Sequence, residues 1–201
     1  MSELYGEIRR LDPVAGHARW RAVRDDLFGT HPSSALDAEQ RKSFHGLRYW
    51  PYDPRFRYTA AVRPLSEHRD EVQTSTAEKM VLRRFGRVEL PVGALDVFWI
   101  EVYGGGVFIP FRDGTSGKET YGGGRYLLDT AKSADLGSTD AGELVLDFNF
   151  AYHPSCQFND RWSCPLAPRE NWLVARIEAG ERSYSGAAGD GGGGYEPGAH
   201  A

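Results

Sequence analysis

Polar side chains that interrupt apolar stretches are the residues of this chain best suited to chemistry. Asp113 follows an apolar run, and Asp147 interrupts the apolar run 144–150. A carboxylate at the rim of a pocket can accept a proton from a substrate, so both aspartates are candidate catalytic residues. Each also has a structural interpretation. Asp113 could accept a hydrogen bond from the backbone of Thr115 or Ser116 in a turn, and Asp147 could lie on the solvent-facing side of its strand.

A second group of residues fits the binding of an anion. Arg125 follows the three glycines 122–124. A guanidinium beside bare glycine backbone has room to hold a carboxylate or a phosphate with two hydrogen bonds. Tyr121 and Asn149 would orient the anion by hydrogen bonds, and Arg112 is a further candidate for binding it. The alternative for Arg125 is an ion pair with an acidic residue of a neighbouring strand.

The chain has two cysteines, Cys156 and Cys164, eight positions apart. In a reducing compartment they are expected to be buried thiols, although a disulfide is allowed if the segment between them folds back. Together with His153 they would give three zinc ligands, but their spacing matches no standard zinc finger. Catalysis by a cysteine with His153 as its base is open as well. We expect no metal and no cofactor, with a zinc or thiol site at the cysteines as an alternative.

Elements that could position these residues begin with a helical region. Residues 12 to about 48 are predicted to be mainly helical, because Asp12-Pro13 is a typical helix start and apolar residues then recur at helical spacing. A second helix is expected to begin near Ser34 or Asp37. The aromatic segment 49–54 contains two prolines, which end the helical region and lead into the main body. We call this segment the aromatic latch.

From residue 56 onward the sequence pattern is typical of β-strands. Gly86 within one of them indicates a bend or a bulge, and glycines 104–106 indicate a hairpin turn. The strands are expected at 57–63, 80–90, 95–103, 107–111, 121–128, 143–152 and 172–178. Short turns without helices between strands predict an antiparallel β-barrel or sandwich of about eight strands, preceded by the N-terminal helical arm. The fold class is therefore mainly β (α+β).

The chain divides into three parts at the level of sequence. Residues 1–54 form the helical arm and the aromatic latch, and residues 55–182 form the antiparallel β domain. Residues 183–201 are rich in glycine and lack apolar periodicity, so we expect a disordered tail.

Charge and composition narrow the expected partners. The formal net charge is −4, and the basic run Arg19, Arg21 and Arg24 is followed by two aspartates, so it is interpreted as a solvated helix face. No apolar stretch is long enough to span a membrane, and the N-terminus lacks the pattern of a signal peptide. The segment 117–119 differs from a phosphate-binding loop because Glu119 stands in place of Ser or Thr. We expect a cytoplasmic protein with a small-molecule ligand, without nucleic acid or membrane partners. The sequence does not specify an oligomeric state.

Several short motifs, taken in order, resemble a bacterial and archaeal family catalogued as domain of unknown function 1684. The resemblance covers about residues 20–181. It rests on segments 50–54 (WPYDP), 111–117 (FRDGTSG), 120–126 (TYGGGRY) and 146–149 (LDFN), and on both cysteines. The resemblance implies that Arg125, Asp147, Asn149 and the cysteines belong to the family pattern. It also implies Asn at the position of His153, which weakens the zinc and cysteine–histidine interpretations. It implies no activity.

These observations together predict a protein that binds or transforms a small polar, anionic molecule in a β-barrel pocket. Arg125, Tyr121, Asn149 and Arg112 would bind the molecule, and Asp147 or Asp113 would accept a proton if a reaction occurs. The alternatives are a non-catalytic accessory or structural module whose polar residues form a buried network, and a zinc or thiol site at the cysteines. No motif specifies a reaction.

Overall fold

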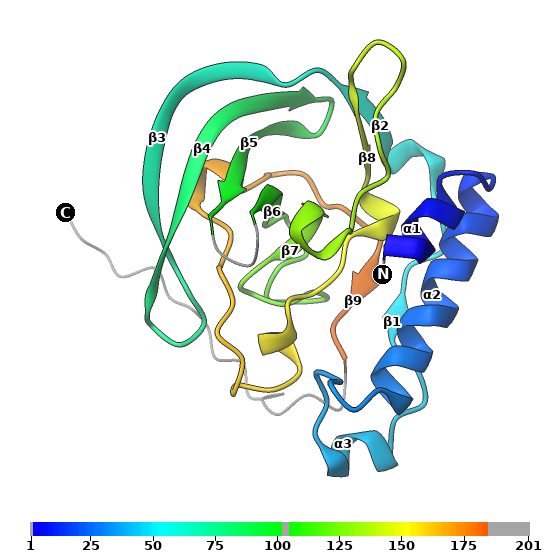
Figure 1. Ribbon diagram of the computed structural model, residues 1–201. Helices are drawn as coiled ribbons and strands as arrows, with labels where there is room; N and C mark the ends of the chain where they lie inside the picture. Colours follow the sequence, from blue (N-terminus) through cyan, green and yellow to red (C-terminus); the bar gives the residue numbers. More distant parts are fainter. Residues whose placement is uncertain (1, 102–104, 185–201) are drawn as a thin grey trace.

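The computed structural model describes residues 2–101 and 105–184 of the chain (Figure 1). Its helices form an arm at one side of the molecule, and its strands form the main body. The helices are α1 (Ser2–Ile8), α2 (Pro13–Thr30) and α3 (Ala38–Lys42). The strands are β1 (Arg48–Tyr49), β2 (Arg57–Ala60), β3 (Arg63–Gln73), β4 (Lys79–Leu90), β5 (Gly93–Ile100), β6 (Gly106–Phe111), β7 (Arg125–Asp129), β8 (Leu144–Asp147) and β9 (Glu181–Arg182). The expected class, mainly β with an N-terminal helical arm, is confirmed.

The strands pair in three antiparallel groups. A five-stranded sheet has the order β3-β4-β5-β6-β7, while β2 pairs with β8 and β1 with β9. Within the described residues these sheets do not close into a barrel. The bulge expected at Gly86 is confirmed by a register shift between Arg84 and Gly86, where a Cβ on the glycine would collide with Val62.

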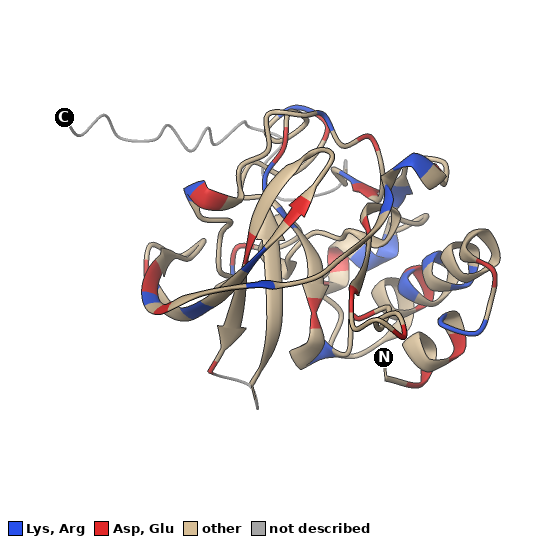
Figure 2. Cartoon of the chain, turned by 90° about the horizontal axis from the view of Figure 1, so that it is seen from above, with Lys and Arg blue, Asp and Glu red and all other residues tan. Residues whose placement is uncertain are grey.

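Strand β3 was not expected from the sequence, because its residues are mostly charged or polar and largely exposed. It is an edge strand of the sheet, and its charges pair across to β4. Glu71 lies 2.6 Å from Lys79, and Glu67 lies 2.9 Å from Arg83. Figure 2 shows acidic and basic residues interspersed over the sheet. Charged side chains on an edge strand oppose edge-to-edge pairing with another chain, which explains a strand without an apolar pattern.

Three of the expected strands need correction. Strand β7 begins only at Arg125, and the preceding glycines lie in a turn in which Gly124 has a φ of +101°. Strand β8 ends at Asp147, and a 3-10 turn, Phe148–Phe150, follows because the Asp147 carboxylate accepts a hydrogen bond from the Asn149 backbone. The segment 172–178 is irregular. The alternation of apolar and polar residues in the sequence does not indicate the side-chain contacts that end these strands.

Helix α1 was also unexpected, and α3 is shorter than predicted. The pairing of β5 with β6 confirms the hairpin at the glycines 104–106, although Gly104 lies outside the described residues. Most of the predicted tail is outside them too. Tyr184, within that predicted tail, is buried against Phe44 and Phe158. No helix in the described part of the chain is long and apolar enough to cross a membrane.

An aromatic cluster joins the arm to the β body. Trp20 of α2 is fully buried, and its Nε1 donates a hydrogen bond of 2.9 Å to the hydroxyl of Tyr5. His17, one turn earlier, packs against Trp20, Phe150 and Tyr52 of the aromatic latch. Aromatic packing of this kind stabilises an interface through the large apolar area that it removes from water. The cluster therefore positions α2 over the β body.

Burial lowers the pKa of His17 from 6.5 to about 4, and the nearby Arg21 acts in the same direction. The unfolded chain thus binds more protons than the folded chain between these pH values. The free energy of unfolding should fall by about 2 kcal/mol as the pH drops from 6.5 to 5. His17→Phe should remove most of this pH dependence in denaturant titrations between pH 6.5 and 5. His45→Phe, at an exposed position, should retain it. An unchanged profile in His17→Phe would contradict the assignment.

Candidate functional site

Arg125 is fully buried and fastens the C-terminal segment 177–181 to β7. Its guanidinium donates hydrogen bonds to the carbonyl oxygens of Ile177, Ala179 and Glu181, at 2.9 Å to Ile177 and 3.3 Å to Glu181. It also lies 3.2 Å from the Asp113 carboxylate. Burial lowers the pKa of Arg125, and the Asp113 carboxylate opposes this effect. The geometry gives the guanidinium a role in holding an irregular stretch of backbone in place.

The Asp113 carboxylate is surrounded by donors from its own chain. It accepts hydrogen bonds from the Thr115 backbone at 3.1 Å, from the Thr115 hydroxyl at 2.9 Å and from the Ile177 backbone at 2.7 Å. The first of these bonds is the turn interaction that the structural interpretation predicts. Its contact with Arg125 is the ion pair that the sequence left open as an alternative. Asp113 and Arg125 therefore belong to one buried network.

Asp147, the last residue of β8, and Asn149 form a second buried network. The Asp147 carboxylate accepts hydrogen bonds from Tyr52 at 3.1 Å, from Arg57 at 2.9 Å and from the Asn149 side chain at 2.8 Å. The Asn149 amide in turn bonds both the N–H and the C=O of Asp53. Both side chains are buried. The network holds the aromatic latch against β8.

The remaining two predicted binding residues lie apart from both networks. Tyr121 lines a cavity of about 260 Å³ beside the end of β3, and its hydroxyl is 3.7 Å from the sulfur of Cys156. Arg112 lines a different cavity, of about 350 Å³, with its guanidinium over the ring of Trp172 at 4.1 Å. The structure thus distributes the six predicted site residues over separate places. Their roles in binding and catalysis stay predictions.

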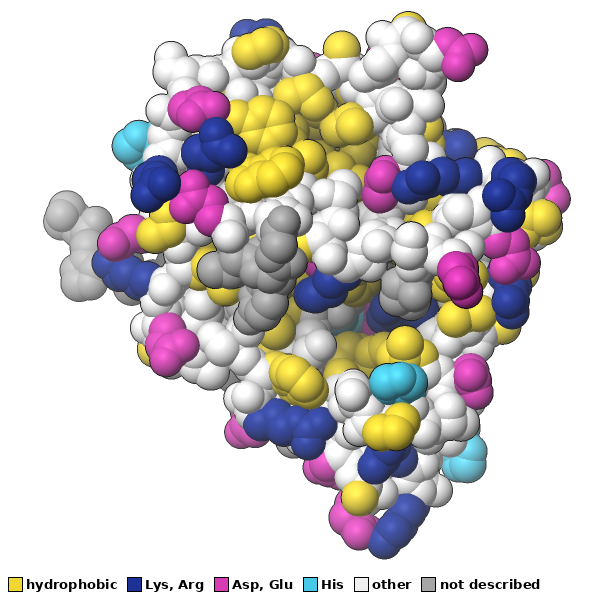
Figure 3. All heavy atoms as spheres, viewed as in Figure 1, with side chains coloured by type: hydrophobic (Ala, Val, Ile, Leu, Met, Phe, Trp, Pro, Cys, Tyr) yellow, Lys and Arg dark blue, Asp and Glu magenta, His cyan; other side chains and the backbone are white. Residues whose placement is uncertain are grey.

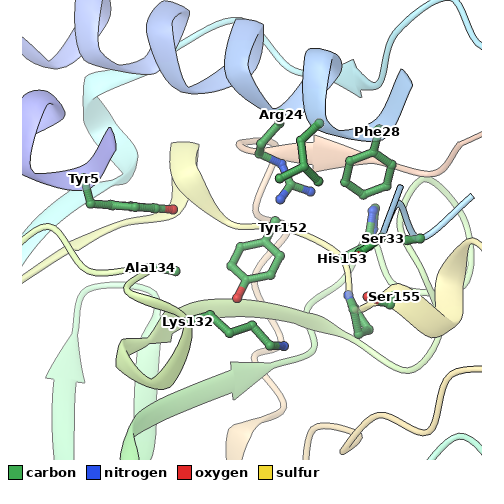
Figure 4. Close-up of a pocket in the computed structure, with 12 residues that line it drawn as sticks. Tyr5, Arg24, Phe28, Ser33, Lys132, Ala134, Tyr152, His153 and Ser155 are labelled. Atoms are coloured by element: carbon green, nitrogen blue, oxygen red, sulfur yellow. The ribbon is translucent and has the colours of Figure 1, made fainter. Parts of the chain in front are cut away.

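A further cavity, of about 170 Å³, lies between the helical arm and the β body, and we call it the arm cavity (Figure 4). The arm contributes Tyr5 of α1 and both Arg24 and Phe28 of α2. The β body contributes Lys132, which follows β7, and the segment 152–155. On the face in Figure 3 the surface is hollowed between the arm and the sheet, with basic side chains at the hollow. Figure 4 shows the arginine and the lysine on opposite sides of the arm cavity.

Two cations and no carboxylate stand among the described residues that line the arm cavity. The carboxylates that balance these cations are not among the lining residues. Arg24, whose side chain is 8% exposed, is 2.6 Å from the fully buried Glu181. Lys132, whose side chain is 61% exposed, is 3.3 Å from the buried Asp129. The cations are thus held by the protein while the wall of the cavity stays basic.

His153 connects the arm cavity to the buried Glu181. Its Nε2 accepts a hydrogen bond of 3.1 Å from the Tyr121 backbone, and its Nδ1 is 3.6 Å from the Glu181 carboxylate. A neutral ring with this acceptor carries its proton on Nδ1, facing Glu181. Burial lowers the pKa of His153, so the ring is neutral at pH 7. Burial alone would raise the pKa of Glu181, but Arg24 and His153 together lower it.

The sequence interpretation missed these residues, and for Arg24 it was wrong. Arg24 is buried rather than part of a solvated helix face. A signal was present in the sequence, because Trp20, Arg24 and Phe28 recur every four residues and so share one face of α2. No local pattern points to Glu181, which is 157 positions away from its partner.

Both cysteines are free thiols. Within residues 2–101 and 105–184 no group of three or more His, Cys, Asp or Glu side chains is arranged to hold a metal ion. His153, the third zinc ligand considered from the sequence, is engaged with Tyr121 and Glu181.

The fold and the cavities define a mainly β protein with a helical arm, and comparisons with known proteins place it in a family. A family model described as "Protein of unknown function (DUF1684)" matches residues 42–182, and the chain belongs to this family. The chain is also similar to a solution NMR structure of an uncharacterized protein from Haloarcula marismortui. The two are 33% identical, with a TM-score of 0.55 and coverage of 81% of this chain and 89% of that chain. No curated protein matches the chain.

Asp147→Asn tests whether the second buried network is structural. The substitution removes the charge that pairs with Arg57 and one acceptor for Tyr52, so we expect a loss of about 2 kcal/mol in the free energy of unfolding. Thermal and denaturant unfolding measure it. Asp140→Asn, at an exposed loop position, is the matched control and should be neutral. Equal stability of the two variants would argue against a structural role for Asp147.

Proposed function

We propose that this protein binds a small polar, anionic molecule in the arm cavity. The observation that carries the proposal is the charge of the cavity wall, where Arg24 and Lys132 stand without a carboxylate among the described lining residues. Cations whose counter-ions do not line the cavity are held in position and still attract an anion into it. A carboxylate or phosphate group is the chemistry that such a wall recognises.

The other lining residues indicate the rest of the ligand. The Tyr5 hydroxyl accepts a hydrogen bond from Trp20, so its own proton is available as a donor. Leu27 and Phe28 give the cavity an apolar side that suits a short hydrocarbon portion. The volume of about 170 Å³ is below the usual range of about 300–1,000 Å³ for drug-sized ligands. We therefore propose a small organic acid or a small phosphate compound as the ligand.

A second candidate is a structural or accessory module. It is favoured by the two networks in which Asp113, Arg125, Asp147 and Asn149 bond to their own chain. Buried polar networks of this kind fix one arrangement of a fold without any ligand. The two candidates differ in whether the arm cavity binds a small molecule.

We propose a cytoplasmic location, supported by the two free thiols, which are typical of a reducing compartment. We further propose that nucleic acids and membranes are not partners, because the formal net charge is −4 and charges of both signs are interspersed over the sheet.

Lys132→Ala is the direct test of anion binding in the arm cavity. The lysine side chain is more than half exposed, and the Asp129 carboxylate keeps its hydrogen bonds from the Tyr152 hydroxyl and the Lys132 backbone, so loss of the lysine side chain should change the melting temperature little. Acetate, lactate and inorganic phosphate would be screened by thermal shift, and hits measured by calorimetry. We expect at least one anion to bind the unmodified chain and to bind Lys132→Ala about tenfold more weakly.

The matched control is Lys118→Ala, at an exposed lysine outside the arm cavity, which should bind as the unmodified chain does. Lys132→Glu should weaken binding further, because it places a negative charge in the wall. If no anion in the screen binds, or if all three variants bind equally, the proposal of anion binding is wrong and the structural module is favoured.

A further inference from the structure

We propose that Cys156 and Cys164 form a redox-active dithiol that exchanges with low-molecular-weight disulfides, with Cys156 as the attacking sulfur. This inference does not rest on the proposed ligand of the arm cavity. It assigns a chemistry to the part of the chain around Tyr121, which neither buried network includes.

The backbone holds Cys164 firmly at the end of β3. Ser75 donates its N–H to the Cys164 carbonyl at 3.0 Å, and its hydroxyl accepts from the Cys164 N–H at 3.1 Å. Cys156 lies in a 3-10 turn, Ser155–Gln157, and the segment between the cysteines folds back so that the two thiols lie near enough to act on each other's pKa. Neighbouring thiols are the arrangement that an internal disulfide requires.

The surroundings of the two sulfurs differ, and the difference selects the nucleophile. Cys156 is partly exposed, whereas Cys164 is buried. Hydrogen bonds from Cys164, Ser75 and Tyr121 to the Cys156 sulfur lower its pKa from 9.0 to about 7. The bond to Cys156 raises the pKa of Cys164, and burial adds to this. Cys156 therefore carries the thiolate, which is the reactive form of cysteine, and Cys164 keeps its proton.

Other ionisable groups face the pair and agree with this order. The phenols of Tyr121 and Tyr126 have raised pKa values and stay protonated at neutral pH. Lys132 lowers the pKa of Cys164, but its effect is smaller than those of Cys156 and of burial, which raise it. The Tyr121 hydroxyl, 3.7 Å from the Cys156 sulfur, can therefore donate a hydrogen bond to a thiolate.

The glycine run before Arg125 shapes this site. A Cβ on Gly123 would collide with the Tyr121 ring and would lie 2.8 Å from Leu166. Only glycine lets the ring lie against the turn, and in this position its hydroxyl contacts Cys156. Tyr121, which contacts Cys156, and Ser75, which bonds the Cys164 backbone, both line the cavity of about 260 Å³. A small disulfide in this cavity would lie against Tyr121, whose hydroxyl contacts the Cys156 sulfur.

The exchange takes place in two steps, and atoms and electrons balance in each. The Cys156 thiolate attacks one sulfur of a disulfide RSSR, forming the mixed disulfide Cys156–S–SR and releasing RS⁻. The charge on Cys156 is then gone, so Cys164 loses the neighbour that raised its pKa and gives up its proton to solvent. The Cys164 thiolate attacks the Cys156 sulfur and releases a second RS⁻. The protein is oxidised by two electrons, and RSSR is reduced to two thiols.

Intact-mass spectrometry after incubation with oxidised glutathione at pH 7 tests the proposal. The unmodified chain should lose two hydrogens, which marks the internal disulfide. Cys164→Ser should stop at a single glutathionyl adduct on Cys156, because the second step is missing. Cys156→Ser should react at least tenfold more slowly than Cys164→Ser. Equal reaction of the two variants, or an adduct on Cys164 alone, would overturn the order of attack.

A measurement on the unmodified chain keeps the proposal testable if either variant fails to fold. The rate of iodoacetamide labelling, followed by peptide mass spectrometry, should have its midpoint near pH 7 for Cys156, with Cys164 labelled much more slowly. Tyr121→Phe should shift the Cys156 midpoint upward, because one hydrogen bond to the thiolate is lost. A midpoint near the ordinary value of 9.0 would overturn the proposal, as would no change of mass with oxidised glutathione.

Discussion

The buried ion pair between Arg24 and Glu181 is the interaction on which the arrangement of this protein depends. It joins α2 to β9 across 157 positions of sequence, at a separation of 2.6 Å. A buried charge without its partner costs several kcal/mol of folding free energy, so removal of either residue should strongly destabilise the fold. Glu181 also accepts a hydrogen bond from the His153 backbone, and its own carbonyl accepts one from Arg125. The helical arm, the C-terminal segment and the segment around His153 therefore meet at one carboxylate.

The structural features that the sequence predicted correctly are local ones. The hairpin of β5 and β6, the bulge at Gly86 and the turn at Asp113 depend on neighbours a few positions away, and each is confirmed. The prediction that the strand continues beyond Asp147 was wrong because of a local side-chain contact. The Asp147 side chain accepts a hydrogen bond from the backbone two positions ahead, and this bond competes with strand pairing. The alternation of apolar and polar residues gives no sign of such a bond.

The candidate site was harder to predict than the fold, because the same residue types serve two purposes. An aspartate beside an arginine can bind a ligand or can hold a turn, and only its three-dimensional partners decide. Asp113 and Arg125 have their own chain as partners, whereas Arg24 lines a cavity that no sequence motif marks. Polar residues on apolar strands were thus a good guide to buried networks and a poor guide to cavities.

The glycine run 122–124 illustrates why position in space matters more than composition. In a strand, three glycines would only weaken pairing, but they lie in a turn, where Gly124 has a positive φ and Gly123 makes room for the Tyr121 ring. That ring reaches Cys156, while the Tyr121 backbone N–H donates to His153. His153 lines the arm cavity and lies three positions before Cys156. The short segment 153–156 therefore contributes to both the arm cavity and the dithiol. Tyr121 contacts this segment through its backbone, at His153, and through its side chain, at Cys156.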